Sequence, residues 1–234
     1  AYDNTVALSG VGMGPLEVRF GNNPLVITTL QDVGVGDVFI VMGQSNNVGE
    51  AVAMLAPTAP AAHPTWVASK LAKDGTWKPN LESDAALFDD RTNATYAVQD
   101  NAGTTHGSYF GVLATKIMEG GVPVAFVPCA LGSTSIDAWA VSTLTSELYG
   151  AALARATQIG DHKAVIWWQG ENEGSGTSTK ATHKAKLNAL VNDWFTRTGR
   201  KWFVWAINGA MAGANGPTIS LAIKEVGQEN PNCV

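Results

Sequence analysis

Four short runs of apolar residues limit the folds open to this chain more than any other feature. They span residues 38–42, 122–127, 164–168 and 202–207, and helical patterns separate them. Runs without polar alternation are typical of strands in a parallel sheet that is covered on both faces. The sequence therefore predicts an α/β fold, a three-layer α/β/α sandwich with a mostly parallel central sheet and right-handed crossovers.

Apolar residues at helical spacing predict the outer layers of this sandwich. The clearest pattern covers residues 179–198, where one stripe recurs at intervals of three and four residues. Shorter or weaker patterns cover residues 109–119, 146–159 and 217–228. The members of the clear stripe are Leu187, Leu190, Val191, Trp194 and Phe195.

Two stretches depart from the alternation of strands and helices. Residues 1–34 hold short β-like runs at 5–8, 16–20 and 25–30, which predicts an N-terminal β segment forming an antiparallel flap or edge. Residues 56–107 are rich in Pro, Ala, Asp and Asn, and their length without periodicity predicts a long excursion or lid. Because no interdomain linker stands out, we expect residues 1–234 to form a single domain.

Charge and composition exclude several classes of function. The chain carries 15 Lys and Arg against 20 Asp and Glu, with no basic run, so we expect no nucleic-acid partner. No apolar stretch approaches about 18 residues, so we expect no membrane span. Cys129 and Cys233 make neither a disulfide framework nor a metal site. Motifs for phosphate or zinc binding are missing, so we expect no cofactor and no metal.

Small polar residues follow three of the apolar runs directly, at 43–46, 129–134 and 169–172. In a sheet of this kind, chemistry collects at the carboxyl ends of the strands. Because these ends meet at one edge of a parallel sheet, we expect the three segments to converge there. The sequence therefore places its candidate site at this edge.

Ser45 is the candidate nucleophile. It follows a tight glycine turn and is predicted to begin a helix running toward residue 55, where unpaired backbone N–H groups and the helix dipole favour an oxyanion. The alternative is that Ser45 only caps this helix. Gly132 can offer an N–H and Gln169 a side-chain amide to the same oxyanion, although a turn glycine and a strand-end amide also have ordinary structural roles.

Glu171 and Glu173 raise a different possibility, the paired carboxylates of a glycosidase. Two carboxylates that are two residues apart flank a bond from opposite faces only if the loop wraps around it. This spacing therefore disfavours a glycosidase.

The motifs together resemble the sialate O-acetylesterase and acetylxylan esterase group of SGNH hydrolases. The resemblance rests on residues 43–46, 132–134 and 167–171, and the flanking residues 35–38, 136–139, 148–149 and 222–225 agree with it. It runs from about residue 35 to the C-terminus and covers residues 56–107 poorly. The order and spacing of the motifs are specific, which a lone Gly-x-Ser is not.

This resemblance implies an SGNH-type, flavodoxin-like fold and assigns roles to the strand-exit residues. Ser45 would be the nucleophile, the N–H groups of Ser45 and Gly132 and the amide of Gln169 would form the oxyanion hole, and Glu171 would support the site. Gln169 replaces the Asn that other SGNH enzymes have in this block. The residues expected to bind the substrate are Gln44, Asn46, Ser133 and Asn172.

The base that such a serine needs is missing from its expected place. The family carries it as the His of an Asp-x-x-His motif near the C-terminus, and no His of this chain has an Asp three residues earlier. His183 falls in register with a helical stripe and His162 precedes a strand at the far edge. His63 and His106 lie in or beside the excursion and remain weaker candidates.

The end of the chain offers another explanation for the missing base. Natural termini normally fall at expendable points, whereas residues 229–234 resemble the lead into a last sheet strand. We therefore expect the last strand and the Asp-x-x-His region on a companion C-terminal fragment.

Two classes of function remain open. The first is a serine esterase that removes O-acetyl groups from a carbohydrate through an acetyl-serine intermediate, without a cofactor. The second is an inactive glycan-binding module, or a deacetylase domain of a larger assembly such as a viral tail. For the protein as a whole, an extracellular, cell-surface or virion-associated location is favoured. The eight Trp suit sugar stacking, although Trp194 belongs to a core stripe.

Overall fold

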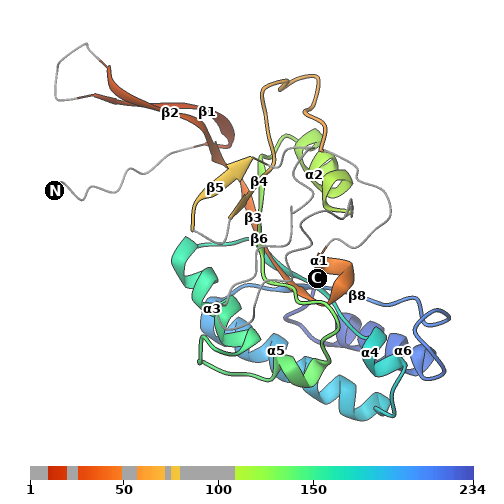
Figure 1. Ribbon diagram of the computed structural model, residues 1–234. Coiled ribbons are helices and arrows are strands. Elements are labelled where there is room, and N and C mark those ends of the chain that lie inside the picture. Colours follow the sequence, from red (N-terminus) through yellow and green to blue (C-terminus); the bar gives the residue numbers. More distant parts are fainter. Residues whose placement is uncertain (1–9, 20–25, 49–56, 72–74, 80–108) are drawn as a thin grey trace.

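The computed structural model describes residues 10–19, 26–48, 57–71, 75–79 and 109–234. Within this part a sheet of six strands runs through the centre (Figure 1), and the order across it is β5-β4-β6-β3-β7-β8. The strands are β3 (Asp37–Gly43), β4 (Ser69–Leu71), β5 (Trp77–Pro79), β6 (Val124–Pro128), β7 (Ala164–Trp168) and β8 (Trp202–Trp205). Five of them are parallel and β5 is an antiparallel edge, which confirms the predicted α/β fold.

Helices cover both faces of this sheet (Figure 1). Helix α2 (Phe110–Glu119) packs on one face, where Phe39 and Val41 of β3 point. On the other face, which Ile40 and Met42 reach, lie α3 (Leu148–Ile159), α5 (Lys180–Thr198) and α6 (Gly216–Glu229). Successive residues of a strand point to opposite faces, so a strand covered on both sides must be apolar at every position.

Helix α5 forms where the clearest stripe predicted it. Its N-terminus is capped by Thr179, whose side chain accepts a hydrogen bond from the Thr182 N–H, and it ends at Gly199 in the left-handed conformation. The buried stripe residues are Leu187, Leu190, Val191 and Trp194. The stripe joins the core against β7 and β8.

Most of the tryptophans belong to the core. Trp139, Trp167, Trp194 and Trp202 are fully buried and pack against one another in edge-on or tilted pairs. Their burial leaves them no part in stacking on a sugar at the surface. The high tryptophan content of the chain is therefore mainly a feature of its packing.

The N-terminal segment forms a separate two-stranded sheet. Strand β1 (Gly12–Arg19) pairs antiparallel with β2 (Val26–Val35), and the hairpin projects away from the central sheet (Figure 1). The predicted antiparallel flap is confirmed over these strands, whereas the expected run at residues 5–8 lies outside the described residues.

Strands β4 and β5 were not predicted. They lie in the stretch expected to be an excursion and extend the sheet beyond β6 instead. Each has three residues and includes Ser, Lys or Pro, so neither shows the apolar run by which the other strands are recognised. Residues 80–108 of this stretch lie outside the described part of the chain.

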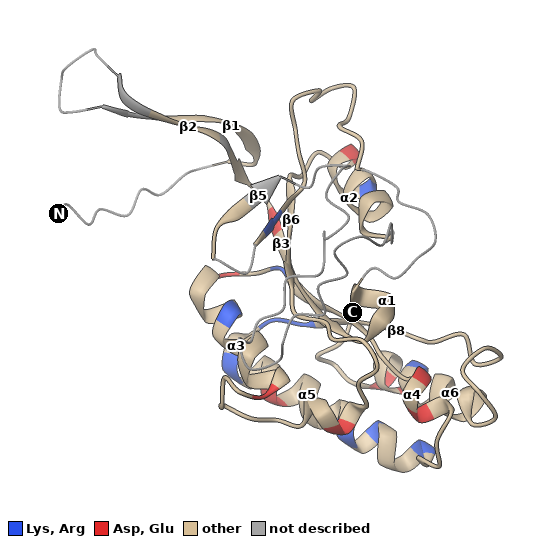
Figure 2. Cartoon of the chain, viewed as in Figure 1, with Lys and Arg blue, Asp and Glu red and all other residues tan. Residues whose placement is uncertain are grey.

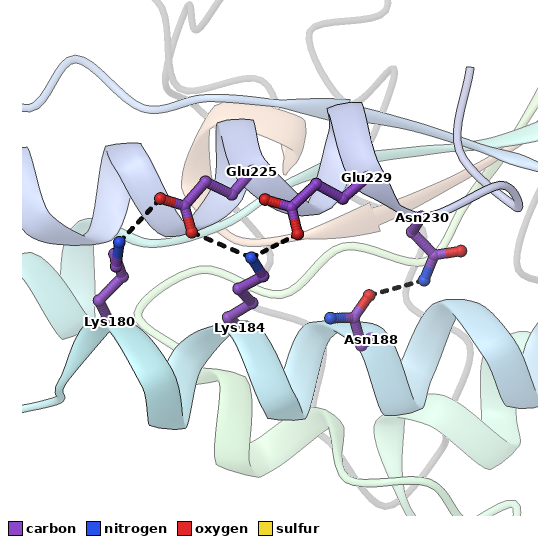
Figure 3. Close-up of polar contacts among 6 residues, drawn as sticks. All are labelled: Lys180, Lys184, Asn188, Glu225, Glu229 and Asn230. Atoms are coloured by element: carbon purple, nitrogen blue, oxygen red, sulfur yellow. Dashed lines mark hydrogen bonds and ion pairs between the residues drawn. The ribbon is translucent and has the colours of Figure 1, made fainter.

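Charged residues gather on the helices rather than on the sheet (Figure 2). The largest cluster joins α5 to α6 and is called the α5–α6 clasp here (Figure 3). Lys184 contacts both Glu225 and Glu229, at 3.0 and 2.7 Å. The other members are Lys180, which pairs with Glu225, and the amides of Asn188 and Asn230, which pair with each other.

The last residues lie beside the amino end of β8. Cys233 forms a parallel bridge with Trp202, and the Val234 N–H donates to the Trp202 carbonyl at 2.9 Å. None of the described helices is long and apolar enough to cross a bilayer.

Candidate active site

The three predicted segments meet at the carboxyl edge of the sheet. Short elements follow the strands there: α1 (Ser45–Val48) after β3, the 3-10 helix η1 (Ile136–Trp139) beyond β6, and α4 (Glu171–Gly174) after β7. Backbone hydrogen bonds join the exits directly. The Gln44 N–H donates to Trp168 O at 3.1 Å, and the Leu131 N–H donates to Gly43 O at 2.9 Å.

Gly43 makes this close junction possible. Its φ of 123° is a conformation that side chains rarely adopt, and a Cβ built there would lie 2.2 Å from the Trp168 carbonyl oxygen. The glycine that precedes the candidate nucleophile therefore fixes how closely the exits of β3 and β7 approach.

Ser45 is the first residue of α1, as predicted, and is half-buried. Gly132, also half-buried, follows Leu131 just as Ser45 follows Gln44, so each comes directly after an anchored residue. Among the described residues, the backbone N–H groups of Ser45 and Gly132 donate to no acceptor, and the Ser45 hydroxyl has no hydrogen-bond partner. Two backbone donors are thus held beside the junction, and neither has an acceptor within the described ranges. The expected continuation of α1 toward residue 55 lies outside the described residues.

Glu171 holds the side chains on both sides of Ser45. Its carboxylate accepts hydrogen bonds from the Gln44 and Asn46 side-chain amides. Burial raises the pKa of Glu171, and the nearby Glu173 adds to this, whereas its own backbone N–H and the two amides lower it. A carboxylate accepts only, so it also decides which atom of each amide faces it.

Gln169 lies fully buried between the three exits. Its Nε2 donates to Gln44 Oε1 at 3.1 Å and to Thr134 O at 2.6 Å, and Glu173 Oε2 lies 3.3 Å away. An amide nitrogen has two hydrogens, so these acceptors already use both. The Gln169 Oε1 has no hydrogen-bond partner among the described residues. In this arrangement the Gln169 amide connects the loops to one another.

The residues expected to bind the substrate fall into two groups. Gln44 is buried, and both ends of its amide are engaged, with Glu171 and with Gln169. Ser133 and Asn172 are exposed at the edge, and Ser133 has a positive φ of 59°. Contact with a substrate remains a prediction for all of them and for Asn46.

Asn47 is a supporting residue that the sequence analysis missed. It is fully buried, and its Nδ2 donates to Met42 O at 2.6 Å and to Ile166 O at 3.3 Å, while its Oδ1 accepts from the Tyr109 hydroxyl at 2.5 Å. It therefore ties α1 to the ends of β3 and β7 and to the start of α2. Its position after Asn46 could have marked it, but nothing in one sequence separates the two asparagines.

Three of the histidines have structural surroundings in the described chain. His63 stacks on Trp66, with ring centroids 3.9 Å apart, and His162 Nε2 accepts from the Trp194 indole at 3.1 Å. His183 is fully buried on α5. His106 lies outside the described residues. Within the described residues no group of three or more His, Cys, Asp or Glu is arranged to hold a metal ion.

Comparisons with known proteins agree with this architecture. The chain is similar in structure to a protein from Arabidopsis thaliana, with a TM-score of 0.61 and 18% identity over 86% of this chain and 84% of that one. It is also similar to a carbohydrate acetylesterase from Xanthomonas citri, with a TM-score of 0.56 and 19% identity over 85% of this chain and 49% of that one. At these identities the likeness shows the fold alone.

Sequence comparison identifies the family. Comparison with curated protein sequences finds no significant match. The model of the family described as carbohydrate esterase, sialic acid-specific acetylesterase (SASA), matches residues 35–231 and so includes all three strand exits. The chain therefore belongs to the carbohydrate esterase family of sialic acid-specific acetylesterases.

Proposed function

We propose that the protein is a serine esterase that removes O-acetyl groups from a carbohydrate, with Ser45 as the nucleophile. The observation that carries the proposal is the pair of backbone N–H groups at Ser45 and Gly132, which have no acceptor in the described part of the chain and lie where the exits of β3, β6 and β7 are joined. Family membership implies an acetylated carbohydrate as the substrate. The Xanthomonas protein with the same fold is a carbohydrate acetylesterase.

The proposed reaction has two steps. A base takes the proton of the Ser45 hydroxyl while Oγ attacks the acetyl carbonyl, and the negative charge that develops on the carbonyl oxygen is stabilised by the N–H groups of Ser45 and Gly132. The sugar oxygen leaves with a proton, and Ser45 is acetylated. Water then attacks the acetyl-serine, and acetate and free Ser45 are released.

Glu171 would act in this scheme through its neighbours. By accepting from both Gln44 and Asn46 it fixes the residues before and after Ser45. The predicted third oxyanion donor, the Gln169 amide, would have to give up one of its present hydrogen bonds to serve, so we base the proposal on the two backbone donors.

Among the described residues, no histidine forms a hydrogen bond with the Ser45 hydroxyl. Of the described histidines, His162 and His183 are buried in the helical layer and His63 stacks on Trp66. His63 and His106 remain the candidate bases, and His106 lies outside the described residues. A histidine base predicts an acid limb near pH 6.5 in the pH dependence of kcat/KM.

Hydrolysis of p-nitrophenyl acetate tests the proposal, with Ser45→Ala as the critical variant. We expect Ser45→Ala to lose at least about 1,000-fold in kcat, because the nucleophile is removed. Ser142→Ala, in the loop after η1, serves as the control and should keep wild-type activity. Turnover that survives Ser45→Ala would exclude this mechanism, and a protein that binds acetylated glycans without releasing acetate would favour the inactive binding module.

The substrate class can be tested with the same pair of proteins. Release of acetate from O-acetylated sialic acid and from acetylated xylan would be compared at equal enzyme concentration. We expect Ser45-dependent release from at least one of these carbohydrates. Hydrolysis of the aryl ester alone would contradict a carbohydrate esterase.

A further inference from the structure

Glu173 is buried beside the site and has contacts that the proposed reaction does not use. Its side chain is 5% exposed, and its Oε1 accepts from the Ile136 N–H at 2.6 Å. Its Oε2 lies 3.3 Å from the Gln169 Nε2. Among the described residues no Lys or Arg forms an ion pair with it. Its carboxylate therefore relies on N–H donors, one of which belongs to the loop after β6.

These contacts fix the chain on both sides of Gly132, whose N–H is proposed to bind the oxyanion. The loop after β6 is held at one end by the Leu131 N–H on Gly43 O, at 2.9 Å. Its other end is held by the Ile136 N–H on Glu173 and by the Gln169 Nε2 on Thr134 O. Gly132 lies between these anchors, so their positions determine where its N–H points.

Glu173 is itself fixed from the opposite side. Asn215, which precedes α6, donates from Nδ2 to the Glu173 carbonyl at 3.3 Å, and its own N–H donates to Gly174 O at 2.9 Å. A Cβ built on Gly174 would lie 2.2 Å from the Ala212 carbonyl oxygen, so α4 and the segment before α6 are in close contact. The backbone of α4 that carries the Glu173 carboxylate is thus held in place on the side opposite the loop after β6.

We infer that Glu173 is a positioning residue for the oxyanion hole: its carboxylate, through the Ile136 N–H and the Gln169 amide, sets the orientation of the loop that carries the Gly132 N–H. The inference rests on the proposed esterase function and deepens it. A purely structural role would require only that the carboxylate stabilise the fold. A positioning role also requires that kcat depend on both carboxylate oxygens.

Glu173→Gln is the decisive variant because it changes one oxygen into an NH2 group and little else. Whichever way the new amide turns, its NH2 faces either the Ile136 N–H or the Gln169 Nε2, and two donors cannot bond to each other. One of the two contacts through which Glu173 orients the loop is then lost. We expect kcat, counted per Ser45 that reacts with a serine-directed phosphonate, to fall about 10- to 100-fold while KM stays within about twofold.

Glu173→Asp keeps a carboxylate but withdraws it by one methylene, so it retains the acceptor chemistry and carries the test if Glu173→Gln fails to fold. Its kcat should lie between those of Glu173→Gln and the wild type. Hydrogen exchange at the Ile136 amide should accelerate in both variants, because its acceptor is weakened or moved. Glu119→Gln, which alters an exposed pair on α2, is the matched control and should change neither quantity.

The outcomes separate the inference from the function on which it rests. A wild type without Ser45-dependent turnover would overturn both. An active wild type, an inactive Ser45→Ala and Glu173 variants with unchanged kcat per reactive Ser45 would overturn only the positioning role. A fall in unfolding stability without a change in kcat would have the same meaning, because it would assign Glu173 to the fold alone.

Discussion

Two pairs of glutamates on neighbouring helices use their charges in opposite ways. Glu225 and Glu229 lie in the α5–α6 clasp, where they pair with lysines of α5 at the surface (Figure 3). Glu171 and Glu173 lie on α4 at the edge of the sheet, and among the described residues they accept only from amide and backbone N–H groups. In the clasp the glutamate charges are balanced by lysine ammonium groups. In the site they are balanced by the dipoles of amide and backbone N–H groups.

The two pairs differ in what each carboxylate is able to control. A lysine ammonium can approach a carboxylate from many directions, and water weakens the attraction at the surface. An amide in a buried site has one donor end and one acceptor end, so an acceptor-only carboxylate decides which end faces it. Glu171 turns the Gln44 amide in this way, and the Gln44 Oε1 then faces the Gln169 Nε2.

The largest effect is expected for Glu171→Gln. The new NH2 group would face one of the two amides that now donate to Glu171, so Gln44 or Asn46 loses its acceptor beside Ser45. We expect kcat for an acetate ester to fall about 100-fold or more. Glu225→Gln in the clasp is the matched control and should stay within about twofold of the wild type. Equal kcat values for the two variants would remove the distinction between the two pairs.

Gly43→Ala tests whether the close contact between the ends of β3 and β7 is rigid. The Cβ would meet the Trp168 carbonyl oxygen in a backbone that cannot easily shift, and the positive φ adds strain. We expect the free energy of unfolding, measured in urea, to fall by about 3 kcal/mol or more. Gly199→Ala, which also has a positive φ but an open environment, should cost about 1 kcal/mol. Similar losses in the two variants would show that only the φ matters.

His183 supplies a test based on pH. It is fully buried without a hydrogen-bond partner among the described residues, and burial, aided by Lys186 and opposed by Asp137, lowers its pKa to about 4. The unfolded chain binds this proton more readily than the folded one. Stability is therefore complete above pH 6.5, its unfolded value, and is lost as the pH falls toward 4, by up to about 3 kcal/mol.

His183→Leu should remove this part of the pH dependence and leave stability at pH 7 unchanged or higher, since no hydrogen bond is lost. Urea unfolding of the variant and the wild type at pH 7 and at pH 4.5 gives the measurement. His162, whose pKa burial also lowers to about 4, contributes equally to both proteins. An unchanged slope in the variant would contradict the assignment to His183.

The smallest effect is expected for the clasp itself. Lys184→Met removes the central ammonium, but the side chains around it remain in contact with water and can rearrange. The urea midpoint should shift less than in Gly199→Ala, and high salt should shrink the difference further. A large loss that salt does not reduce would mean that the clasp resembles the buried network more than its geometry indicates.

The sheet and the location of the site were predictable from local patterns. Residues 38–42 and 164–168 are apolar without interruption because both faces of their strands are covered, and that pattern is visible in one sequence. The polar segments behind these strands then follow from the rule that parallel strands end at one edge. The prediction of Ser45 as the nucleophile rests on this position together with Gly132 and Gln169 at the neighbouring strand ends.

The supporting roles of Glu173 and Asn47 were not predictable, because their partners are distant in sequence. Glu173 bonds to Ile136 across 37 positions, and Asn47 bonds to Tyr109 across 62. Such pairs leave no periodic signal, and an isolated polar residue in a loop resembles any other. Strands β4 and β5 were missed for a related reason, since they are ordered by their place beside β6 rather than by apolar residues of their own.

The hydrogen bond between Trp194 and His162 gives the protein an optical response to acid. Trp194 is fully buried, and its indole N–H donates to the Nε2 of His162. Only a neutral imidazole can accept this hydrogen bond. Protonation of His162 replaces this acceptor by a cation that quenches indole fluorescence. The emission of Trp194 should therefore fall as His162 titrates near pH 4.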